Sequence, residues 1–192
     1  MDIEPRPSYP FEFRQADVMT LDPAFLASFD AIHASPPCQE HSATVHIHGP
    51  GRHLDLIEPT RALLVRSGKP YIIENVVGAP LIDPVVLDGP MFGLRVYRRR
   101  LFECSFFALT PQRPTPRVRG STNAGRGYSS FAAGAKMICV AGNNFRRADG
   151  AAAMGIDWPA TRAEIAQAIP PAYTEFLGRQ LLAQVTAARA AA

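Results

Sequence analysis

The chain has 192 residues, a formal net charge of +3 and a hydrophobic content of 47%. These values are typical of a soluble globular protein with one domain and a sizeable core. No run of about 18 apolar residues predicts a transmembrane helix, and the charged, proline-rich start differs from a signal peptide. Three widely spaced cysteines argue against a disulfide framework, so we expect a reducing, cytoplasmic compartment and no membrane partner.

Strands and helices alternate through the first half of the chain. The predicted elements are a strand over 11–18, a helix over 22–28, a strand over 29–33, a helix over 56–67 and strands over 71–76 and 100–107. Asp22 with Pro23 forms a helix start, and Gly68 is a helix stop. Loops are predicted over 40–53 and 80–90.

The composition changes after residue 109 to proline, arginine, glycine, serine and threonine. The predicted elements here are an irregular stretch over 110–134, a strand over 136–141, a loop over 143–152 and helices over 161–168 and 171–192. We expect one domain over 1–192, with a small insert over 110–152. Alternating strands and helices imply a mostly parallel α/β sheet with helices on both faces.

The stretch Ala34-Ser35-Pro36-Pro37-Cys38-Gln39 places a cysteine at the end of a predicted strand. Two prolines restrict the backbone before it, so the thiol is presented in a defined direction. A buried structural cysteine is the commoner fate of a lone Cys, but the prolines and the polar loop that follows favour a nucleophile. Cys104 and Cys139 lie in apolar runs and are predicted to be packing residues.

A neighbouring predicted strand, Tyr71-Ile72-Ile73-Glu74-Asn75-Val76, carries a carboxylate at its end. The carboxyl ends of neighbouring strands in an open α/β sheet line one crevice, so Cys38 and Glu74 are predicted to face the same pocket. A thiol and a carboxylate together suit covalent and acid–base chemistry. Side chains alternate along a strand, which places Arg98 and Arg100 on one face and Arg99 on the other.

These motifs together resemble those of the DNA cytosine-5 methyltransferases: Pro36-Pro37-Cys38-Gln39, Glu74-Asn75-Val76 and the paired arginines Arg98 and Arg100. The resemblance extends over most of the chain. It implies an α/β, Rossmann-like sheet of the S-adenosylmethionine-dependent methyltransferase type. It also implies double-stranded DNA as the partner and a flipped cytosine as the reacting base.

The resemblance implies a role for each of four catalytic residues. The Cys38 thiolate adds to C6 of cytosine, C5 then takes a methyl group from S-adenosylmethionine, a base removes the C5 proton and the cysteine is eliminated. Glu74 hydrogen-bonds N3 and the exocyclic amine, helped by a pKa raised in a dry pocket. Arg98 and Arg100 match the family's Gln-x-Arg-x-Arg strand, with Arg100 expected at the cytosine O2. Val96 stands at the glutamine position, which is a departure from the family.

The methyl donor is expected to lie among residues from both ends of the chain. By the resemblance, Asp2 holds the ribose hydroxyls, Ile3 lies on the adenine and Asp17 binds the adenine amine. Gln167 stands where the family usually has an asparagine. The residues predicted to bind the cofactor S-adenosylmethionine are Asp2, Ile3, Asp17, Val18, Pro37 and Gln167.

Basic residues cluster over 95–100 and 113–126, which suits a phosphate backbone, although a solvated basic face or a disordered basic linker has the same composition. By the resemblance, the loop over 40–53 closes on DNA and 110–152 is a target-recognition segment. The predicted DNA contacts are Gln39, Ser42, Asn75, Arg113, Arg117 and Arg119, with Arg126 as a further candidate. No cysteines or carboxylates with ligand spacing accompany the four histidines of the loop, so no metal site is expected: His41, His46, His48 and His53.

The family's Phe-x-Gly-x-Gly loop is absent from this sequence, which therefore resembles a member truncated before its second strand. Loss of the central first strand would leave unpaired backbone groups on both sides of a gap. Three explanations stay open: a misassigned start codon, a second chain or homo-oligomer that completes the sheet, or a relative that binds DNA without methylating it. The functions left open are a methyltransferase, a catalytically silent or incomplete DNA-binding module, and an enzyme that adds another electrophile. The compact size favours a phage or prophage origin and the cytoplasm of the bacterial host.

Overall fold

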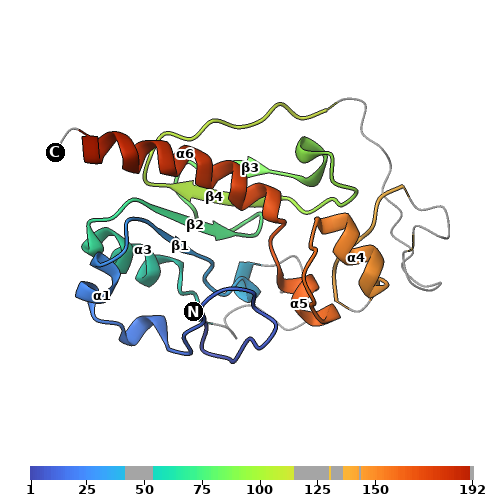
Figure 1. Cartoon of the computed structure of the whole chain (residues 1–192), viewed down its shortest axis with the longest axis horizontal. Helices are drawn as coiled ribbons and strands as arrows, with labels where there is room; N and C mark the ends of the chain where they lie inside the picture. The colour runs from blue at the N-terminus through green and yellow to red at the C-terminus, as the bar shows by residue number, and fades with distance from the viewer. Residues whose placement is uncertain (42–53, 115–129, 131–135, 143, 191–192) are drawn as a thin grey trace.

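The computed structural model describes residues 1–41, 54–114, 130, 136–142 and 144–190, and it has an α/β fold (Figure 1). A four-stranded mixed sheet in the order β1-β2-β4-β3 lies at its centre. The strands are β1 (Ile32–Ala34), β2 (Tyr71–Asn75), β3 (Val85–Leu87) and β4 (Arg100–Cys104). This arrangement, with helices packed on it, is compatible with a Rossmann-like fold.

The prediction of a mostly parallel sheet is wrong, because only β1 and β2 are parallel. β4 is antiparallel to both β2 and β3, with Glu74 paired to Phe102 and Val85 also paired to Phe102. A parallel neighbour would need a helical crossover after β2. The chain instead returns through a segment rich in proline and glycine, 76–99, whose only regular elements are short.

Eight helical segments accompany the sheet within the described residues. They are η1 (Val18–Thr20), α1 (Pro23–Ala27), η2 (Gln39–His41), α3 (Ile57–Ser67), η3 (Gly89–Phe92), α4 (Arg147–Met154), α5 (Arg162–Gln167) and α6 (Pro171–Ala190). The predicted signals of α1 and α3 are confirmed: Asp22 caps α1 through the Ala24 N–H, and Gly68 ends α3 with φ of 67°. α5 begins with a capping box between Thr161 and Glu164.

Four local predictions are wrong. The segments 11–18 and 136–141 form no strand, and each makes one isolated bridge: Gln15 with Asp2, and Ile138 with Val96. The predicted loop over 80–90 contains β3 and the start of η3, and the one over 143–152 contains most of α4. An alternating pattern predicts a strand only if a neighbouring strand is there to pair with it, and these segments have none within the described residues.

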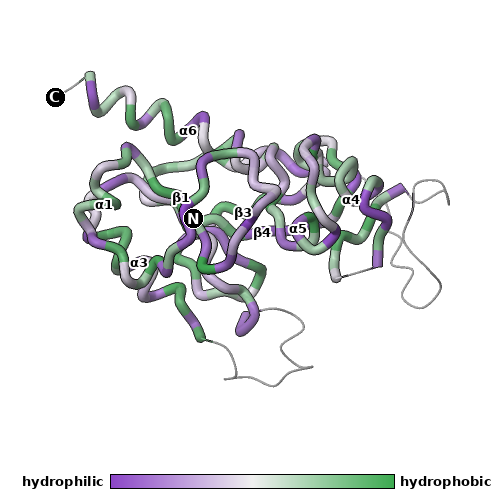
Figure 2. Tube along the Cα trace, turned by 60° about the horizontal axis from the view of Figure 1, so that its bottom comes forward, coloured by the Kyte–Doolittle hydropathy of each residue, from purple (hydrophilic) through white to green (hydrophobic). Residues whose placement is uncertain are grey.

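The two faces of the sheet pack against different helices. Ile72 and Phe102 lie on one face, in a buried cluster with Tyr173 and Leu177 of α6. The opposite face packs on α3, whose Arg61 reaches Glu103 of β4. Figure 1 shows α6 running across the sheet, and Figure 2 shows the C-terminal part of α6 extending beyond the rest of the molecule. Helices therefore cover both faces, as predicted.

A second hydrophobic core lies beside the sheet and joins segments far apart in the sequence. Its buried residues are Val96, Ile138, Val140, Phe145, Ala153, Met154, Ile156, Ala160 and Ile165. We call this the second lobe, built by 94–96, 137–145 and the α4–α5 region. The predicted insert over 110–152 thus covers only part of it, because α5 is needed to close the core.

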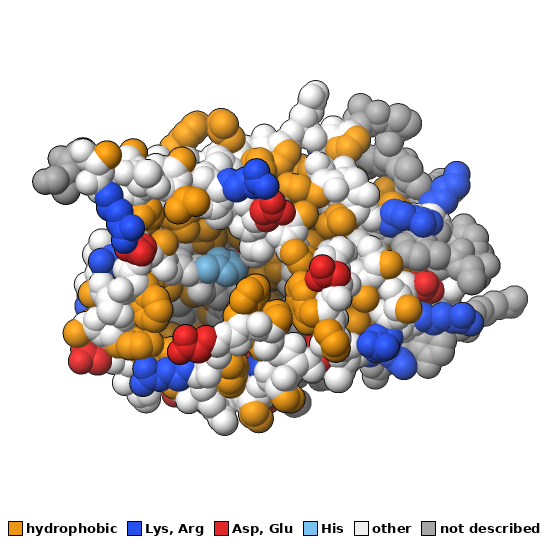
Figure 3. All heavy atoms as spheres, in the orientation of Figure 1, with side chains coloured by type: hydrophobic (Ala, Val, Ile, Leu, Met, Phe, Trp, Pro, Cys, Tyr) orange, Lys and Arg blue, Asp and Glu red, His pale blue; other side chains and the backbone are white. Residues whose placement is uncertain are grey.

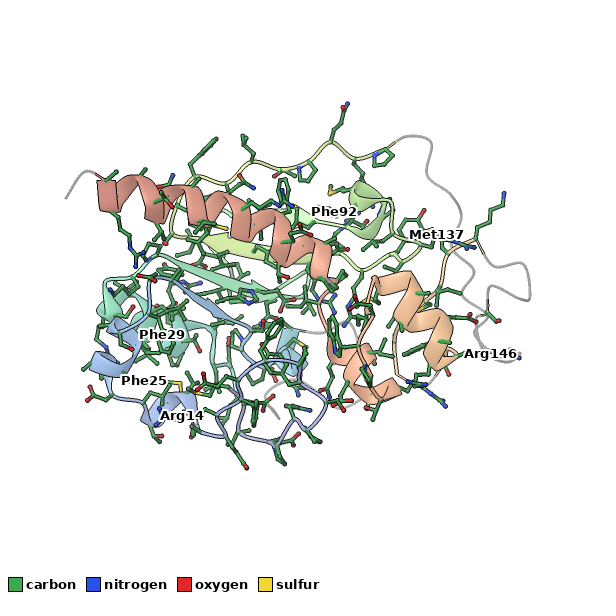
Figure 4. All side chains as sticks on the ribbon, in the orientation of Figure 1. Arg14, Phe25, Phe29, Phe92, Met137 and Arg146 are labelled. Carbon is green, nitrogen blue, oxygen red and sulfur yellow. The ribbon has the colours of Figure 1, made fainter. Side chains whose placement is uncertain are left out.

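The N-terminal segment is held against α1 by an aromatic contact. The Arg14 guanidinium lies 4.4 Å from the centre of the Phe25 ring, and Phe25 packs edge-on against Phe29 at 5.1 Å (Figure 4).

Within the described residues, no helix has the length and apolar character needed to span a membrane.

Candidate active site

Three strand ends meet at one edge of the sheet and define the candidate active site. β1 and β2 are parallel, so their carboxyl ends lie at the same edge. β4 is antiparallel to β2 with Asn75 opposite Leu101, so β4 begins where β2 ends. Cys38 follows β1, Glu74 lies near the end of β2, and Arg100 opens β4. Cys38 and Glu74 are 36 positions apart in the sequence, and Glu74 and Arg100 are 26 apart. The sheet brings all three to the same edge.

Cys38 lies in a segment that is fixed on both sides. Before it, the Pro36 carbonyl accepts a hydrogen bond from the Asn75 amide at 3.0 Å. After it, the Cys38 carbonyl accepts one from the His41 N–H at 3.1 Å, which closes the short helix η2. The Cys38 side chain is half-buried and forms no disulfide. The thiol is thus held on a defined backbone and remains partly open to solvent.

Glu74 is buried beside a cation. One of its carboxylate oxygens lies 3.0 Å from Nε of Arg100, and the Ser35 hydroxyl hydrogen-bonds to the carboxylate. Burial raises the pKa of Glu74, and the charges of Arg100 and Arg98 and the Ser35 hydrogen bond offset this only in part. A carboxyl group in this position holds its proton at higher pH than an exposed one does, which suits a proton donor.

Arg98 has the predicted orientation and an additional structural role. Burial alternates as expected, with Arg98 buried, Arg99 exposed and Arg100 half-buried. The Arg98 guanidinium donates to the carbonyls of Val140 at 2.9 Å and Ala166 at 2.6 Å, so it connects the sheet to the second lobe. Nε alone has no hydrogen-bond partner among the described residues.

Arg98 interacts electrostatically with the three residues of the candidate site, Cys38, Glu74 and Arg100. Burial, assisted by the charge of Arg100, lowers the pKa of Arg98 to about 10, while Glu74 and Cys38 act in the opposite direction. The guanidinium is therefore still protonated at neutral pH. Tyr173 of α6 donates its hydroxyl to the Arg98 carbonyl at 3.0 Å and so supports this backbone.

The other two cysteines differ from Cys38 in their surroundings. Cys104 packs at the border of the core between the sheet and α6, and burial raises its pKa to about 11. It is therefore held as a thiol at neutral pH, which agrees with its predicted packing role. Cys139 is half-buried between Ile138 and Val140 of the second lobe, so it too has apolar neighbours.

The predicted cofactor residues come close together but are already engaged. The Asp2 carboxylate accepts bonds from the Glu4 N–H at 3.0 Å and from Arg6 Nε at 2.8 Å. Arg6 also donates to the Gln167 side chain at 3.2 Å, which joins the two ends of the chain through a residue that sequence reasoning missed. Asp17 caps η1 through the Met19 N–H at 2.9 Å.

The contacts of Asp2 and Asp17 can be compared with the roles predicted for them in binding S-adenosylmethionine. Neither Asp2 nor Asp17 ends a strand, contrary to the prediction, since their segments share only one bridge. Both oxygens of Asp2 have partners, from the Glu4 N–H and Arg6 Nε. Ile3 is 65% exposed, Val18 is half-buried and Pro37 is exposed. Among the described residues, Asp2 and Asp17 are thus engaged within the chain, and their role toward the methyl donor stays a prediction.

The predicted DNA contacts fall into three groups. Gln39 is exposed next to Cys38 and free to reach a ligand. Asn75 is buried and engaged with the Pro36 carbonyl and the Val76 N–H, so it supports the Cys38 segment rather than facing outward. Arg113 forms an ion pair with the buried Asp88. Ser42, Arg117, Arg119 and Arg126 lie outside the described residues, as do His46, His48 and His53.

Two histidines are described, and they have different environments. His41 lies 3.0 Å from Asp55 through Nε2. His33, on β1, is reached by solvent but stands in a crowded position where desolvation lowers its pKa to about 4. Among the described residues, no group of three or more His, Cys, Asp or Glu side chains could hold a metal ion.

Figure 3 shows one face of the molecule, with a hollow near its centre and a histidine side chain within it. Lysine and arginine side chains are spread around the outline of this face and over the second lobe. Arg146, labelled in Figure 4, lies at the start of α4 and is exposed. The face shown in Figure 3 is thus mixed in charge.

Compared with the models of known protein families, the chain matches none, and no curated protein matches it.

Proposed function

We propose that this protein modifies cytosine in DNA by covalent catalysis through Cys38, as a DNA cytosine-5 methyltransferase. One observation supports this most strongly: Cys38 follows β1, Glu74 lies on β2 and Arg100 opens β4, so the three lie at one edge of the sheet. A nucleophile, a carboxyl group with a raised pKa and a cation are the groups that addition to a pyrimidine ring requires. Their motifs also resemble those of the family.

Each side chain has a task in the proposed reaction. The Cys38 thiolate forms a bond to C6 of the cytosine, and the electron pair of the C5–C6 double bond moves toward C5. Glu74, protonated, donates to N3 so that the ring accepts the added electrons at lower cost. Arg100 neutralises the developing charge at O2, and the 3.0 Å contact between Arg100 Nε and the Glu74 carboxyl group orients both groups beforehand.

S-adenosylmethionine, when bound, would supply the methyl group that the activated C5 takes up. The C5 proton would then leave to a base, the Cys38–C6 bond would break and N3 would return its proton to Glu74, which restores the aromatic ring, the thiolate and the carboxyl group. This chain's described residues account for the activation of the base, and the donor-binding residues remain a prediction.

A second function is favoured by a specific observation. Asp2, Asp17 and Gln167 are engaged with other groups of the protein, and β1 is the last strand of the sheet on its side within the described residues. An incomplete module that binds DNA, and that needs a partner chain to complete the cofactor site, would have these features. In that case Cys38 would be present without turnover.

Covalent trapping separates the two functions. A duplex with 5-fluorocytosine is incubated with the protein and S-adenosylmethionine, because fluorine at C5 blocks the final elimination. An active methyltransferase gives an adduct that survives denaturation and disappears in Cys38→Ser. Cys104→Ser is the matched control and keeps the adduct, since Cys104 packs at the core instead of at the site. A duplex that binds without forming any adduct would support the incomplete module.

A further inference from the structure

The segment that carries Cys38 is also held from its far side, by a contact that the proposed reaction does not use. His41 ends η2, three residues after Cys38, and its Nε2 lies 3.0 Å from a carboxylate oxygen of Asp55. That nitrogen is buried, and apart from this carboxylate it has no polar partner among the described residues. A buried imidazole nitrogen without this carboxylate would lose its polar neighbour, so the contact constrains where η2 can lie.

Asp55 is in turn fixed to a rigid element. Its other carboxylate oxygen accepts a hydrogen bond from the Ile57 N–H at 3.1 Å, at the start of α3. Ile57 is 1% exposed, so this end of the helix is anchored in the core. The Ile57 hydrogen bond and the contact with His41 lower the pKa of Asp55, which is therefore a carboxylate at neutral pH.

A third element confines the same helix. Gly78, in the turn after β2, has φ of 102°, and a Cβ placed there would come within 3.5 Å of the His41 carbonyl oxygen. Asn75, from the end of β2, already holds the Pro36 carbonyl. The segment 36–41 is therefore bounded by β2, by the turn at Gly78 and by the start of α3.

We propose that the His41–Asp55 pair positions the Cys38 thiol for addition to the base by tying η2 to the start of α3. This inference rests on the proposed function of Cys38 as a nucleophile. His41 and Asp55 are positioning residues: they act through the backbone bond between His41 and Cys38 and touch no reacting atom. Small displacements of a nucleophile reduce the rate strongly, whereas binding of DNA by the rest of the surface does not depend on them.

The test measures adduct formation on a duplex with 5-azacytosine. Nitrogen at position 5 makes C6 more electrophilic, so Cys38 can add without a methyl donor. We expect Asp55→Ala and His41→Ala to reduce the rate of adduct formation about tenfold or more, with the dissociation constant for DNA changed less than about twofold. His41→Gln restores most of the rate, because its amide can donate to Asp55 over a similar distance.

Asp22→Ala is the matched control. Asp22 accepts from the N–H two residues later at the start of α1, as Asp55 does at the start of α3, but α1 precedes β1 whereas Cys38 follows it. We expect it to leave the adduct rate unchanged. Equal loss in Asp22→Ala and Asp55→Ala would overturn the proposal, as would full activity in His41→Ala.

Failure of the proposed function gives a different result from failure of this inference. If the wild-type protein binds the duplex and forms no adduct, the function of Cys38 as a nucleophile is wrong. Hydrogen exchange of the His41 amide still tests the tether, since its bond to the Cys38 carbonyl must protect it. Exchange at His41 that is at least about tenfold faster in Asp55→Ala supports the tether, and unchanged exchange overturns it.

Discussion

Burial and the neighbouring charge of Arg100 have opposite effects on the pKa of Glu74. Its pKa is raised by burial, while Arg100 at 3.0 Å prevents the full rise. The opposite arrangement is found at Asp55, where hydrogen bonds from Ile57 and His41 lower the pKa. Glu74 contacts Ser35 before Cys38, and Asp55 contacts His41 after it. The raised pKa of Glu74 fits a proton donor, and the lowered pKa of Asp55 fits a permanently charged anchor.

Replacing Glu74 by glutamine tests its role as a proton donor. The amide of the Glu74→Gln variant can still donate a hydrogen bond to N3, but it cannot give up a proton, so we expect the rate of methyl transfer or adduct formation to fall about 100-fold. DNA affinity should change little. Rates are measured under single-turnover conditions, with Glu175→Gln as the control because Glu175 is exposed on α6.

An unchanged rate in Glu74→Gln would mean that the hydrogen bond alone supports addition. The raised pKa of Glu74 would then follow from its position without serving the reaction.

At the scale of single elements, α3 is attached to the sheet by a buried ion pair. Arg61 donates two bonds of 2.8 Å to the two oxygens of Glu103, and both residues are under 10% exposed. Glu103 also accepts from the Ile82 N–H, and Arg61 donates to the Pro80 carbonyl. The pair thus connects a helix, a strand and a loop, and its loss leaves several groups without partners.

We expect Glu103→Gln to lower the free energy of unfolding by about 3 kcal/mol, because the buried Arg61 charge keeps only the exposed Glu58 as a counter-charge. Urea denaturation followed by circular dichroism measures the change. Arg179→Ala removes an exposed ion pair on α6 and should cost less than about 1 kcal/mol. Similar losses in the two variants would show that the Arg61–Glu103 pair is not the attachment of α3.

The capping box of α5 makes a smaller contribution that can be measured separately. The Thr161 hydroxyl accepts from the Glu164 N–H at 3.2 Å, and the Glu164 carboxylate accepts from the Thr161 N–H at 2.7 Å. We expect Thr161→Ala to destabilise the protein by about 1 kcal/mol, and Thr161→Ser to have little effect. A loss in Thr161→Ser equal to that in Thr161→Ala would indicate that the methyl group, and not the cap, is responsible.

At the scale of the whole molecule, Arg98 connects two cores near the site. Tyr173 and Phe102 belong to the core between the sheet and α6, and Val96 and Ile165 belong to the second lobe. Arg98 lies between them and binds carbonyls of the second lobe while its own carbonyl is held by Tyr173. The segment just before β4 thus links both cores, and the next residues supply Arg100 to the site.

The stability of the whole protein is expected to depend on pH through His33. Its pKa is about 4 in the folded protein and 6.5 ordinarily, so between these values the unfolded chain binds more protons. Stability contributed by neutral His33 is present above pH 6.5 and is lost as the pH falls toward 4. We expect His33→Gln to show a smaller decrease in urea midpoint between pH 7 and pH 4.5 than the wild type.

An identical decrease in wild type and His33→Gln would show that carboxylates alone cause the acid sensitivity. Glu103 and Asp2, whose pKa values are lowered by ion pairs, contribute to both proteins equally and cancel in this comparison.

The sequence alone determined the elements whose signals are local. Asp22 with Pro23 and Gly68 located the ends of α1 and α3, because caps act within a few residues. Apolar runs located β1, β2 and β4, and the motifs around Cys38, Glu74 and Arg100 indicated a shared site. Side-chain alternation also predicted that Arg98 and Arg99 would face opposite ways, and Arg98 is buried while Arg99 is exposed.

Only the tertiary structure decided what depends on neighbours distant in the chain. The direction of β4, the failure of 11–18 to form a strand and the engagement of Asp2 by Arg6 all follow from which segments come together. The same holds for Asn75, whose amide serves the backbone at Pro36 instead of facing a ligand. Strand pairing and ion pairing are satisfied by partners tens of residues away, so no local pattern specifies them.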